Sequence, residues 1–599
     1  MAPAWTAVAV AAAAVAASSD GGERPHIVLA VVDDLGWSDV GFQGSKDLGG
    51  STPHLDALAA EGLRFESLYG AAECTPSRAM LLTGTHAVRL GLQDSVIHGT
   101  EPRGLDLRAA TLADALRSDH GYATHAVGKW HLGFFAPAYL PRRRGFDTFY
   151  GILTGGGDHF AHTTTESFAV RGNRSTASHS VTGRNLWEDD GPLDDAAFAA
   201  ADEAHTTRLY TARALRKIQT FGETEGKRSF LYLAYQAVHG PVQAESASYA
   251  AGTACAGVAD RADAARSALA AGARDPDLAY ASDGDVSWKA RPRLCGMVAE
   301  IDGSVGQIRA ALGGRWASTI LWVLSDNGGV KRHGSSNYPL RGQKGEYWEG
   351  GVRLASVVAG GYLADRGLGA GATSGALAHL VDVHASLTAA ARGSPLVEDV
   401  GADWLAGANL WPTLLTETAA PPRSALLLNR NSRTWGGGGA LVADSAAVVA
   451  CDAEDDAPAV CGRRYKLVVE NSVGDAVLYR AGRAYLAADD YGAAGFAAAL
   501  DGRRSELFPS PLVHLFDLDA DPSEASDLAN ATASDPALAA VLDGLLALWA
   551  DVDDVAAVDD VWRDDGPLAS PDFFDGAWMP WRDENDAPYA QYGLLPARR

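Results

Sequence analysis

Basic residues are scarce in this 599-residue chain. Lys and Arg number 50 against 75 Asp and Glu, which gives a formal net charge of −25. That balance argues against a nucleic acid or an anionic membrane surface as a partner, because both bind basic proteins. It does not exclude a small anionic ligand, because charges more than about 8 Å apart are largely screened at physiological salt.

Long apolar runs are also missing, except in residues 1–19, which end in the small residues Ala17 and Ser18. This pattern predicts a secretory signal peptide, although no Lys or Arg precedes the run. A membrane anchor is the alternative, but alanine is weakly apolar and the run is barely long enough to span a bilayer. We therefore expect a mature chain without a membrane span, lysosomal or extracellular, with Asn173 and Asn530 as candidate glycosylation sites.

Cysteine is rare and its count is odd: Cys74, Cys255, Cys295, Cys451 and Cys461. In an oxidising compartment an odd count leaves at least one thiol outside the disulfides. Cys451 and Cys461 are close enough in sequence to close a small loop, and Cys255 could pair with Cys295. That arrangement would leave Cys74 unpaired, but the spacing alone does not fix the pairing.

The remaining composition, 47% hydrophobic and 21% charged, is typical of a globular protein. Four apolar, β-rich runs are separated by helical stretches such as 107–117 and 205–220, which predicts buried strands in a helix-flanked sheet, an α/β fold. Each run leads directly into polar residues: 26–32 into Asp33 and Asp34, 122–127 into Lys129 and His131, 229–238 into His239, and 319–324 into Asp326 and Asn327. Ligands of open α/β sheets bind beyond the carboxyl ends of the strands, so we expect these residues to converge at one edge.

The pattern changes after about residue 420. Shorter apolar runs are followed by a helical stretch, at 441–450, 464–471, 476–487 and 535–550. This change predicts a smaller C-terminal α+β domain over 420–599, after a large domain over 24–419.

Two further segments carry weaker signals. Residues 245–288 are rich in Ala and Asp and are predicted to be an insertion with little regular structure. The acidic tail 551–599 contains Trp562, Trp578 and Trp581 and is expected to wrap over the surface.

Two polar pairs, Asp33-Asp34 and Asp326-Asn327, offer only oxygen ligands. Oxygen ligands select calcium or magnesium over zinc or copper. A single pair of this kind would most often be a solvated turn. Two pairs that each follow a predicted buried strand favour a metal site instead.

Cys74 begins the segment Cys-Thr-Pro-Ser-Arg. Pro76 suits the first turn of a helix, which would put Cys74 near a helix N-terminus, where backbone N–H groups favour anions. A buried structural cysteine is the alternative, but the neighbouring proline and Arg78 fit a core thiol poorly.

These segments resemble the signatures of a known family. Cys74–Arg78 followed by Leu81–Gly84 resembles the first sulfatase signature, in which the cysteine is converted to formylglycine, and Gly121–His131 resembles the second. The two in order, about fifty residues apart, are highly specific. Other segments are similar to the arylsulfatase B branch, so that the resemblance covers roughly residues 25–582: Gly36–Gly41, Arg144–Phe149, Arg341–Lys344, Trp348–Arg353 and Phe574–Trp581.

The resemblance implies an alkaline-phosphatase-like fold, with a large mixed sheet flanked by helices, and a calcium site. One calcium ion would be bound by Asp33, Asp34, Asp326 and Asn327, together with an oxygen of the modified Cys74.

The resemblance also assigns catalytic roles. Arg78 and His131 would hold the formylglycine hydrate, while Lys129, His239 and Lys344 would bind the sulfate, with His239 also a candidate proton donor to the leaving alcohol. One hydroxyl of the hydrate would attack sulfur, and the second would let the sulfated intermediate expel sulfate and restore the aldehyde. The implied substrates are sulfated sugars or aryl sulfates, and the implied partner is formylglycine-generating enzyme.

Three positions depart from the family pattern. Glu73 stands where the first signature prefers a small or aliphatic residue, which puts recognition by the modifying enzyme in doubt. Thr85 replaces a usual arginine, which leaves the core chemistry intact. Gly155–Asp158 replaces a segment with a serine and an acidic residue before the aspartate, which leaves the identity of the substrate open.

Two other functions remain as alternatives. A phosphatase or phosphodiesterase of the same superfamily would commonly use Ser or Thr with zinc and histidine-rich ligands, whereas this chain offers Asp and Asn. A non-catalytic relative that binds sulfated glycans would be expected to lack Cys74 or a metal ligand. A chain in which Cys74 stays unmodified would behave in the same way.

Overall fold

The computed structural model describes residues 24–93, 95–171, 176–201, 204–223, 227–393, 405–416, 422–430, 439–444, 463–470, 512–551 and 577–580. The expected signal peptide, Cys451, Cys461, the predicted strand at 476–487, Asn173, Trp562 and Trp581 lie outside the described residues. Within these ranges, no helix combines the length and the apolar character needed to cross a membrane.

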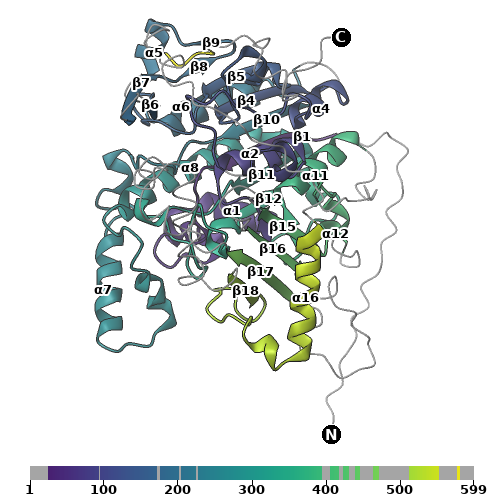
Figure 1. The fold of residues 1–599 in the computed structure, drawn as a ribbon. Helices are drawn as coiled ribbons and strands as arrows, with labels where there is room; N and C mark the ends of the chain where they lie inside the picture. The colour runs from purple at the N-terminus through teal and green to yellow at the C-terminus, as the bar shows by residue number, and fades with distance from the viewer. Residues whose placement is uncertain are drawn as a thin grey trace.

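A mixed ten-stranded sheet forms the centre of the molecule (Figure 1). Its five neighbouring strands β11, β1, β10, β4 and β5 are parallel, while β12 and β8 continue the sheet on either side in the antiparallel sense. In sheet order the strands are β13 (Ala372–Ser374), β2 (Leu63–Phe65), β12 (Ser356–Ala359), β11 (Thr319–Ser325), β1 (His26–Val32), β10 (Ser229–Ala234), β4 (Ala123–Lys129), β5 (Thr148–Ile152), β8 (Trp187–Glu188) and β9 (Gly191–Pro192).

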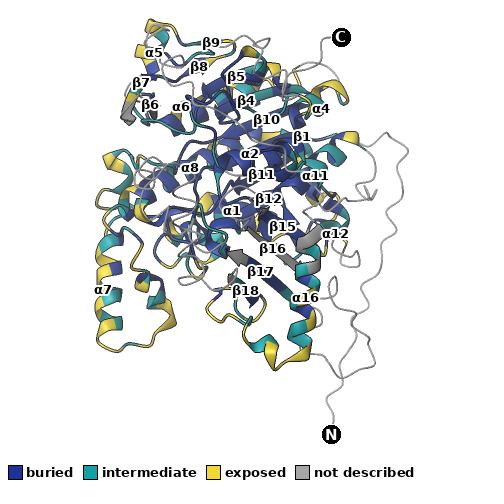
Figure 2. Cartoon of the chain, viewed as in Figure 1, coloured by how far each residue is buried: buried dark blue, intermediate teal, exposed yellow. Residues whose placement is uncertain are grey.

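Alternate residues of the central strands supply two separate cores, one on each face of the sheet. In β1, Ile27, Leu29 and Val31 pack with one set of helices, and the intervening residues pack with the other. The central strands are accordingly dark blue in Figure 2. Burial on both faces explains why 26–32 reads as one continuous apolar run. The first set is α2 (Cys74–Thr83), α4 (Leu112–Ser118) and α11 (Leu380–Arg392), and the second is α1 (Pro53–Glu61), α6 (Thr206–Gln219) and α8 (Arg291–Leu312).

The predicted convergence of the polar clusters is confirmed. The strands β11, β1, β10 and β4 are adjacent and parallel, so their carboxyl ends lie at the same edge of the sheet. The predicted run 229–238 is a strand only as far as Ala234, and the chain then turns toward this edge.

A smaller α+β unit lies beside the large sheet, as predicted for the C-terminal part of the chain. Four antiparallel strands form its sheet: β15 (Ala425–Arg430), β16 (Gly439–Asp444), β17 (Arg464–Glu470) and β18 (Leu512–Asp517). Helix α16 (Pro536–Asp551) packs on it through Val541 and Leu545 (Figure 1). The sequence patterns predicted β16, β17 and α16 but not β15 and β18.

Short elements complete the described fold. Two-stranded sheets pair β3 (Leu68–Tyr69) with β14 (Ala378–His379) and β6 (Thr163–Arg171) with β7 (Thr176–Arg184). The short helices are α3 (Ala87–Leu90), α5 (Asp195–Ala201), α9 (Glu349–Val352), α10 (Gly361–Ala364) and α12 (Trp411–Leu415).

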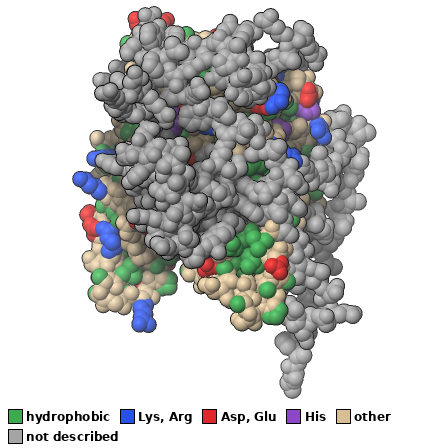
Figure 3. Space-filling model, in the orientation of Figure 1, with side chains coloured by type: hydrophobic (Ala, Val, Ile, Leu, Met, Phe, Trp, Pro, Cys, Tyr) green, Lys and Arg blue, Asp and Glu red, His purple; other side chains and the backbone are tan. Residues whose placement is uncertain are grey.

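The prediction of little regular structure in residues 245–288 is wrong. The segment contains the 13-residue helix α7 (Val258–Ala270), which projects at the lower left of Figure 1. Ala262 and Ala265 pack against Trp288, and the high helix propensity of alanine outweighs the polar composition. On this lobe in Figure 3, basic and acidic side chains lie at separate spots and form no field of one sign.

The disulfide expected between Cys255 and Cys295 is present and fastens this insertion to α8. Cys74 is a free, buried cysteine.

Part of the C-terminal tail is buried, in contrast to the expectation that it wraps over the surface. Trp578 is 0% exposed, and its ring N–H donates to the carbonyl oxygen of Thr164 at 3.1 Å. Its own carbonyl oxygen accepts from Trp187 at 3.1 Å. Tail residues therefore complete the core beside the hairpin β6–β7.

A buried ion cluster joins the C-terminal sheet to the large domain. Lys466 of β17 lies 3.0 Å from a carboxylate oxygen of Glu349 and 2.8 Å from one of Glu524, and all three side chains are 0% exposed. The hydroxyl of Tyr69 donates to the other oxygen of Glu349 at 2.9 Å. Removing the cation would leave two carboxylates facing each other away from water.

The substitution Lys466→Met is therefore expected to lower the free energy of unfolding by about 3–5 kcal/mol. Urea denaturation followed by tryptophan fluorescence measures the loss. The matched control is Lys289→Met at an exposed position, which should change stability by no more than about 0.5 kcal/mol. A loss below about 1 kcal/mol for Lys466→Met would contradict the proposed importance of this cluster.

Candidate active site

The edge where the parallel strands end holds all of the predicted metal ligands. Asp33 and Asp34 follow β1, and Asp326 and Asn327 follow β11; all four are buried. Asp34 adopts a left-handed backbone conformation with φ 59°, as does His131 with φ 56°. Such conformations cost about 1–3 kcal/mol in non-glycine residues and cluster at functional sites.

Cys74 is the first residue of α2, as predicted, and its sulfur faces this acidic edge. Lys344 Nζ donates to Sγ at 3.0 Å, and the Sγ–H group lies 3.3 Å from Asp33 Oδ1. One ligand atom from each of Asp33, Asp34, Cys74 and Asp326 lies within 4.8 Å of the others. An atom bonded to the Cβ of residue 74 in place of this sulfur would lie in the same small cluster.

Three buried carboxylates lie against three buried cations in this cluster. The ion pairs are Lys129 Nζ with Asp33 Oδ2 at 2.6 Å, Lys344 Nζ with Asp34 Oδ1 at 2.6 Å, and Arg78 Nη2 with Asp326 Oδ2 at 2.8 Å. The formal charges cancel, so the cluster alone has no net attraction for an anion. A bound divalent cation would give the cluster a net positive charge.

Two buried oxygens in the cluster have no hydrogen-bond donor: Asp34 Oδ2 and Asn327 Oδ1. Buried polar atoms are almost always satisfied, so these two require an explanation. Both are hard oxygen ligands adjacent to two further carboxylates, which is the donor set that calcium or magnesium prefers. The residues present therefore fit a hard divalent cation.

Burial shifts the pKa values of the acidic groups. Burial raises the pKa of Asp33 to about 7, although the charges of Lys129 and Arg78 act in the opposite direction. Burial also disfavours the ionised form of Asp34, but the charges of Lys344 and Lys129 outweigh it and lower its pKa. A cation at this edge would displace protons, because metal ligands bind in the deprotonated form.

The thiol of Cys74 is held in its protonated form. Burial, and next the charge of Asp33, raise its pKa well above the ordinary value. The thiolate is the nucleophilic form of cysteine, so an unmodified Cys74 is poorly suited to attack.

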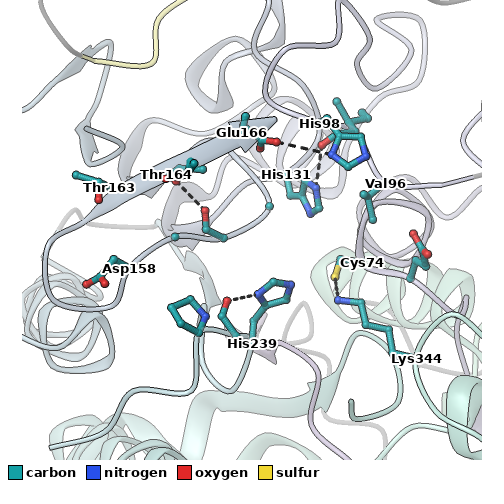
Figure 4. Close-up of a pocket in the computed structure, with 18 of the residues that line it drawn as sticks. Cys74, Val96, His98, His131, Asp158, Thr163, Thr164, Glu166, His239 and Lys344 are labelled. Carbon is teal, nitrogen blue, oxygen red and sulfur yellow. Dashed lines mark hydrogen bonds and ion pairs between the residues drawn. The ribbon is translucent and has the colours of Figure 1, made fainter. Parts of the chain in front are cut away.

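A cavity of about 780 Å³ opens above the cluster. Cys74, His131, His239 and Lys344 line it, and Figure 4 shows Cys74 and Lys344 joined by their hydrogen bond on one side of this space. The predicted residues Arg78 and Lys129 lie beneath it, with side chains 0% exposed. The structure thus brings all ten predicted residues together, but in two layers.

Two histidines line the cavity in the neutral form. Burial, and next the charge of Lys129, lower the pKa of His131 well below its ordinary value. Burial, and next the charge of Lys344, lower the pKa of His239 to about 3, against the opposite effect of Asp34. His239 Nε2 lies 3.8 Å from Asp34 Oδ2, so a bound anion or cation would change its charge environment directly.

The glycines that depart from the family pattern lie between these histidines. A Cβ atom on Gly155 would lie 2.7 Å from the ring of His131, and one on Gly156 would lie 3.0 Å from Nδ1 of His239. Both positions therefore need glycine for the backbone to approach the rings this closely.

Some cavity residues were not predicted. His98, Glu166 and Arg332 line the cavity but belong to no motif. Glu166 lies on the edge hairpin β6–β7, and His98 lies in the loop after α3, far from Cys74 along the chain. Only the fold brings these residues to the site, and no spacing in the sequence indicates that they lie there.

The family model described as Sulfatase matches residues 25–393, which is more than half of the chain. The chain belongs to the sulfatase family.

Two curated relatives are similar to the chain over part of their own length. Arylsulfatase J of Mus musculus is 35% identical over 415 residues, which cover 69% of this chain and 59% of that protein. N-acetylgalactosamine-6-sulfatase of Mus musculus is 30% identical over 413 residues, 66% of each chain. The similarity therefore spans less than two thirds of either relative.

A solved structure supports the fold. The PsFucS1 sulfatase from Pseudoalteromonas sp. superposes with a TM-score of 0.57 at 20% identity, covering 90% of this chain and 92% of that one. The predicted fold class, the alkaline-phosphatase-like fold of sulfatases, is confirmed.

The substitution Gly156→Ala is expected to displace the His239 ring by a few tenths of an ångström, because the added Cβ atom meets it at 3.0 Å. The affinity of the cavity for inorganic sulfate, measured by calorimetry, should fall about tenfold as a wall residue moves. Gly284→Ala is the matched control, because a Cβ atom there would have open space around it. Equal affinities for the two variants would contradict the close packing at Gly156.

Proposed function

We propose that this protein hydrolyses sulfate esters, of sulfated sugars or aryl sulfates, with a nucleophile formed from Cys74. The observation that carries the proposal is the position of Cys74. It lies at a helix N-terminus, within hydrogen-bond distance of Lys344 and beside three buried carboxylates, at the base of a cavity. The name of the relative N-acetylgalactosamine-6-sulfatase supports a sulfated sugar as one substrate class.

We propose that Cys74 is converted to formylglycine by formylglycine-generating enzyme. The hydrated aldehyde would supply one hydroxyl that attacks sulfur and a second that allows sulfate to be released. The raised pKa of the thiol supports a need for this change. Glu73 precedes Cys74 as the N-cap residue of α2, and its side chain makes no capping hydrogen bond.

We propose one calcium ion as the metal, bound by Asp33, Asp34, Asp326 and Asn327 with an oxygen of the modified Cys74. The two buried oxygens without donors support this assignment. When bound, calcium would supply positive charge that stabilises the negative oxygens of the sulfate group.

The remaining residues take the roles that the family signatures suggest. Arg78, which is held by Asp326 through Nε at 3.0 Å, and His131 would hold the hydrate. Lys344 would contact the sulfate from the cavity wall, and Lys129 would contribute its charge from the layer beneath. The charge of a bound sulfate ester would raise the lowered pKa of His239, and the protonated ring would then donate a proton to the leaving alcohol, so that the sulfur–oxygen bond breaks without leaving an alkoxide.

Neither alternative function has an observation in its favour. A zinc-dependent phosphatase would need a histidine-rich ligand set. In the described part of the chain, the groups that could hold a metal contain aspartates, Cys74 and one histidine, His239. A non-catalytic relative that only binds glycans would not need the complete set of proposed catalytic and metal-binding residues that this chain carries.

We further propose that residues 24–419 form the catalytic domain and 420–599 the smaller one, after a signal peptide at 1–19. The chain would act in the secretory pathway, in the lysosome or outside the cell. The Cys255–Cys295 disulfide supports an oxidising compartment.

Peptide mass spectrometry of protein secreted from a competent host is expected to show that Cys74 has lost its sulfur. Cys74→Ala should reduce sulfate-ester hydrolysis about 10⁴-fold or more while the protein stays folded. Cys74→Ser is the informative control, because a single hydroxyl could accept sulfate once but could not release it by restoring an aldehyde. Multiple turnovers by either variant, or an intact thiol in active protein, would refute the proposed nucleophile.

Removal of calcium with a chelator is expected to abolish hydrolysis, and added calcium should restore it. Asp326→Asn should weaken calcium binding about 100-fold or more, measured by calorimetry, because it removes a charged ligand and frees Arg78. Asp365→Asn, at an exposed position, is the matched control and should bind calcium like the wild type. Full activity after exhaustive chelation would exclude the metal.

A further inference from the structure

The cavity has a mouth whose side chains take no part in the proposed reaction. Its base consists of Cys74, Lys344 and the buried cluster. Its mouth is lined by Glu73, Asp158 and Glu166, with His98 and Arg332. A substrate larger than sulfate would extend from the base toward these residues, because they line the same cavity.

Glu166 is held in place by two contacts with the neighbouring loop. Its Oε1 atom accepts from the backbone N–H of Gly99 at 3.1 Å, and its Oε2 atom lies 3.7 Å from Nδ1 of His98. A Cβ atom on Gly99 would lie 2.9 Å from Cγ of Glu166, so the contact depends on glycine. The side chain of Glu166 is 14% exposed and that of His98 is 31% exposed.

The Glu166–His98 pair lies next to the catalytic histidine of the proposed reaction. His131 Nε2 donates to the carbonyl oxygen of Ile97 at 3.0 Å, which ties the segment carrying His98 and Gly99 to the site. In Figure 4 the pair lies near His131, and Asp158 lies on another side of the cavity. A sugar ring attached to the sulfate would therefore meet carboxylates on more than one side.

The charge of the mouth is negative. Asp158 accepts from two backbone N–H groups and from Gln243 at 2.8 Å, which outweigh the effect of its burial and lower its pKa. None of these donors is a cation, so they do not neutralise the negative charge of Asp158. Among the described residues that line the mouth, three are carboxylates and one, the exposed Arg332, is always positive.

We propose that Glu166, oriented by Gly99 and His98, accepts hydrogen bonds from hydroxyl groups of a sugar ring that carries the scissile sulfate, and excludes a second sulfate or carboxylate from that ring. The preferred substrate class is therefore a singly sulfated sugar with free neighbouring hydroxyls. This inference rests on the proposed sulfatase function, which concerns the base of the same cavity.

The chemistry of the Glu166 carboxylate and of the sugar substituents explains why a singly sulfated sugar would be preferred. A carboxylate is a pure acceptor and forms strong, charge-assisted hydrogen bonds with O–H donors. A second sulfate has only acceptor oxygens and a like charge, which is unfavourable in a partly buried site. Selectivity of this kind comes from repulsion of the wrong ligand as much as from attraction of the right one.

The test compares three substrates: an aryl sulfate without hydroxyls, a monosulfated hexosamine, and the same hexosamine with a second sulfate on a neighbouring carbon. The wild type should prefer the monosulfated sugar to the disulfated one by about tenfold or more in kcat/KM. Glu166→Gln should reduce that preference about tenfold, through KM more than kcat, and should leave the aryl sulfate within about twofold. Glu223→Gln, an exposed charge-matched control outside the cavity, should change none of these values.

Three outcomes would overturn the inference. The first is an unchanged preference in Glu166→Gln, and the second is an equal loss on all three substrates, which would indicate a structural role. The third is a wild-type preference for the disulfated sugar that Arg332→Gln removes, which would assign the mouth to a second anion. Binding of both sugars to Cys74→Ala, measured by calorimetry, tests the same preference without turnover, so a failure of the proposed hydrolysis would be recognised separately.

Discussion

The central constraint on this protein is the burial of three carboxylates at one edge of a parallel sheet. Asp33, Asp34 and Asp326 follow strands that are buried on both faces, so their charges cannot reach bulk water. Burying an ion without a partner costs several kcal/mol, and the cost is reduced only by close counter-charges. Three cations meet this need from three different parts of the chain: Arg78 from α2, Lys129 from β4 and Lys344 from the loop before α9. The site is therefore also a junction that fixes these elements relative to one another.

This junction extends into the C-terminal unit. The segment that carries Lys344 continues to Glu349, which is held by Lys466 of β17 and by the hydroxyl of Tyr69. Glu524 accepts from the backbone N–H of Glu349 at 2.7 Å, so two residues of the smaller unit hold the end of this segment. The position of Lys344 beside Cys74 thus depends on contacts made more than a hundred residues later in the chain. The large sheet and its helices without the smaller unit would lose these constraints.

The sequence was sufficient for the parts of the structure that are encoded locally. Asp33 and Asp326 each follow an apolar run directly, and adjacent parallel strands bring such positions together whatever the intervening chain does. The helix start at Cys74 was predictable from Pro76 for the same reason. Contacts between distant segments were not predictable, because no spacing records them: Glu166 reaches the backbone of Gly99, and Trp578 enters the core beside Thr164. Helix α7 was missed although its segment is rich in alanine, because the polar residues among the alanines obscured the face through which Ala262 and Ala265 pack against Trp288.

The net charge of −25 does not by itself decide which anions bind, because charges more than about 8 Å away are largely screened. The buried cluster is neutral by itself, so attraction for an anionic ester depends on a metal that the oxygen donors Asp34 and Asn327 are placed to bind. Positive charge would then be confined to the base of the cavity, beneath a mouth that carries carboxylates. One anionic group would be favoured at the base, whereas a second would lie close to the carboxylates of the mouth. A protein with many basic residues around the same cluster would bind any polyanion, and it would lose the distinction between one sulfate and several. Under the proposed function, the carboxylates at the mouth, and not the acidic composition of the whole chain, would favour a substrate with a single sulfate.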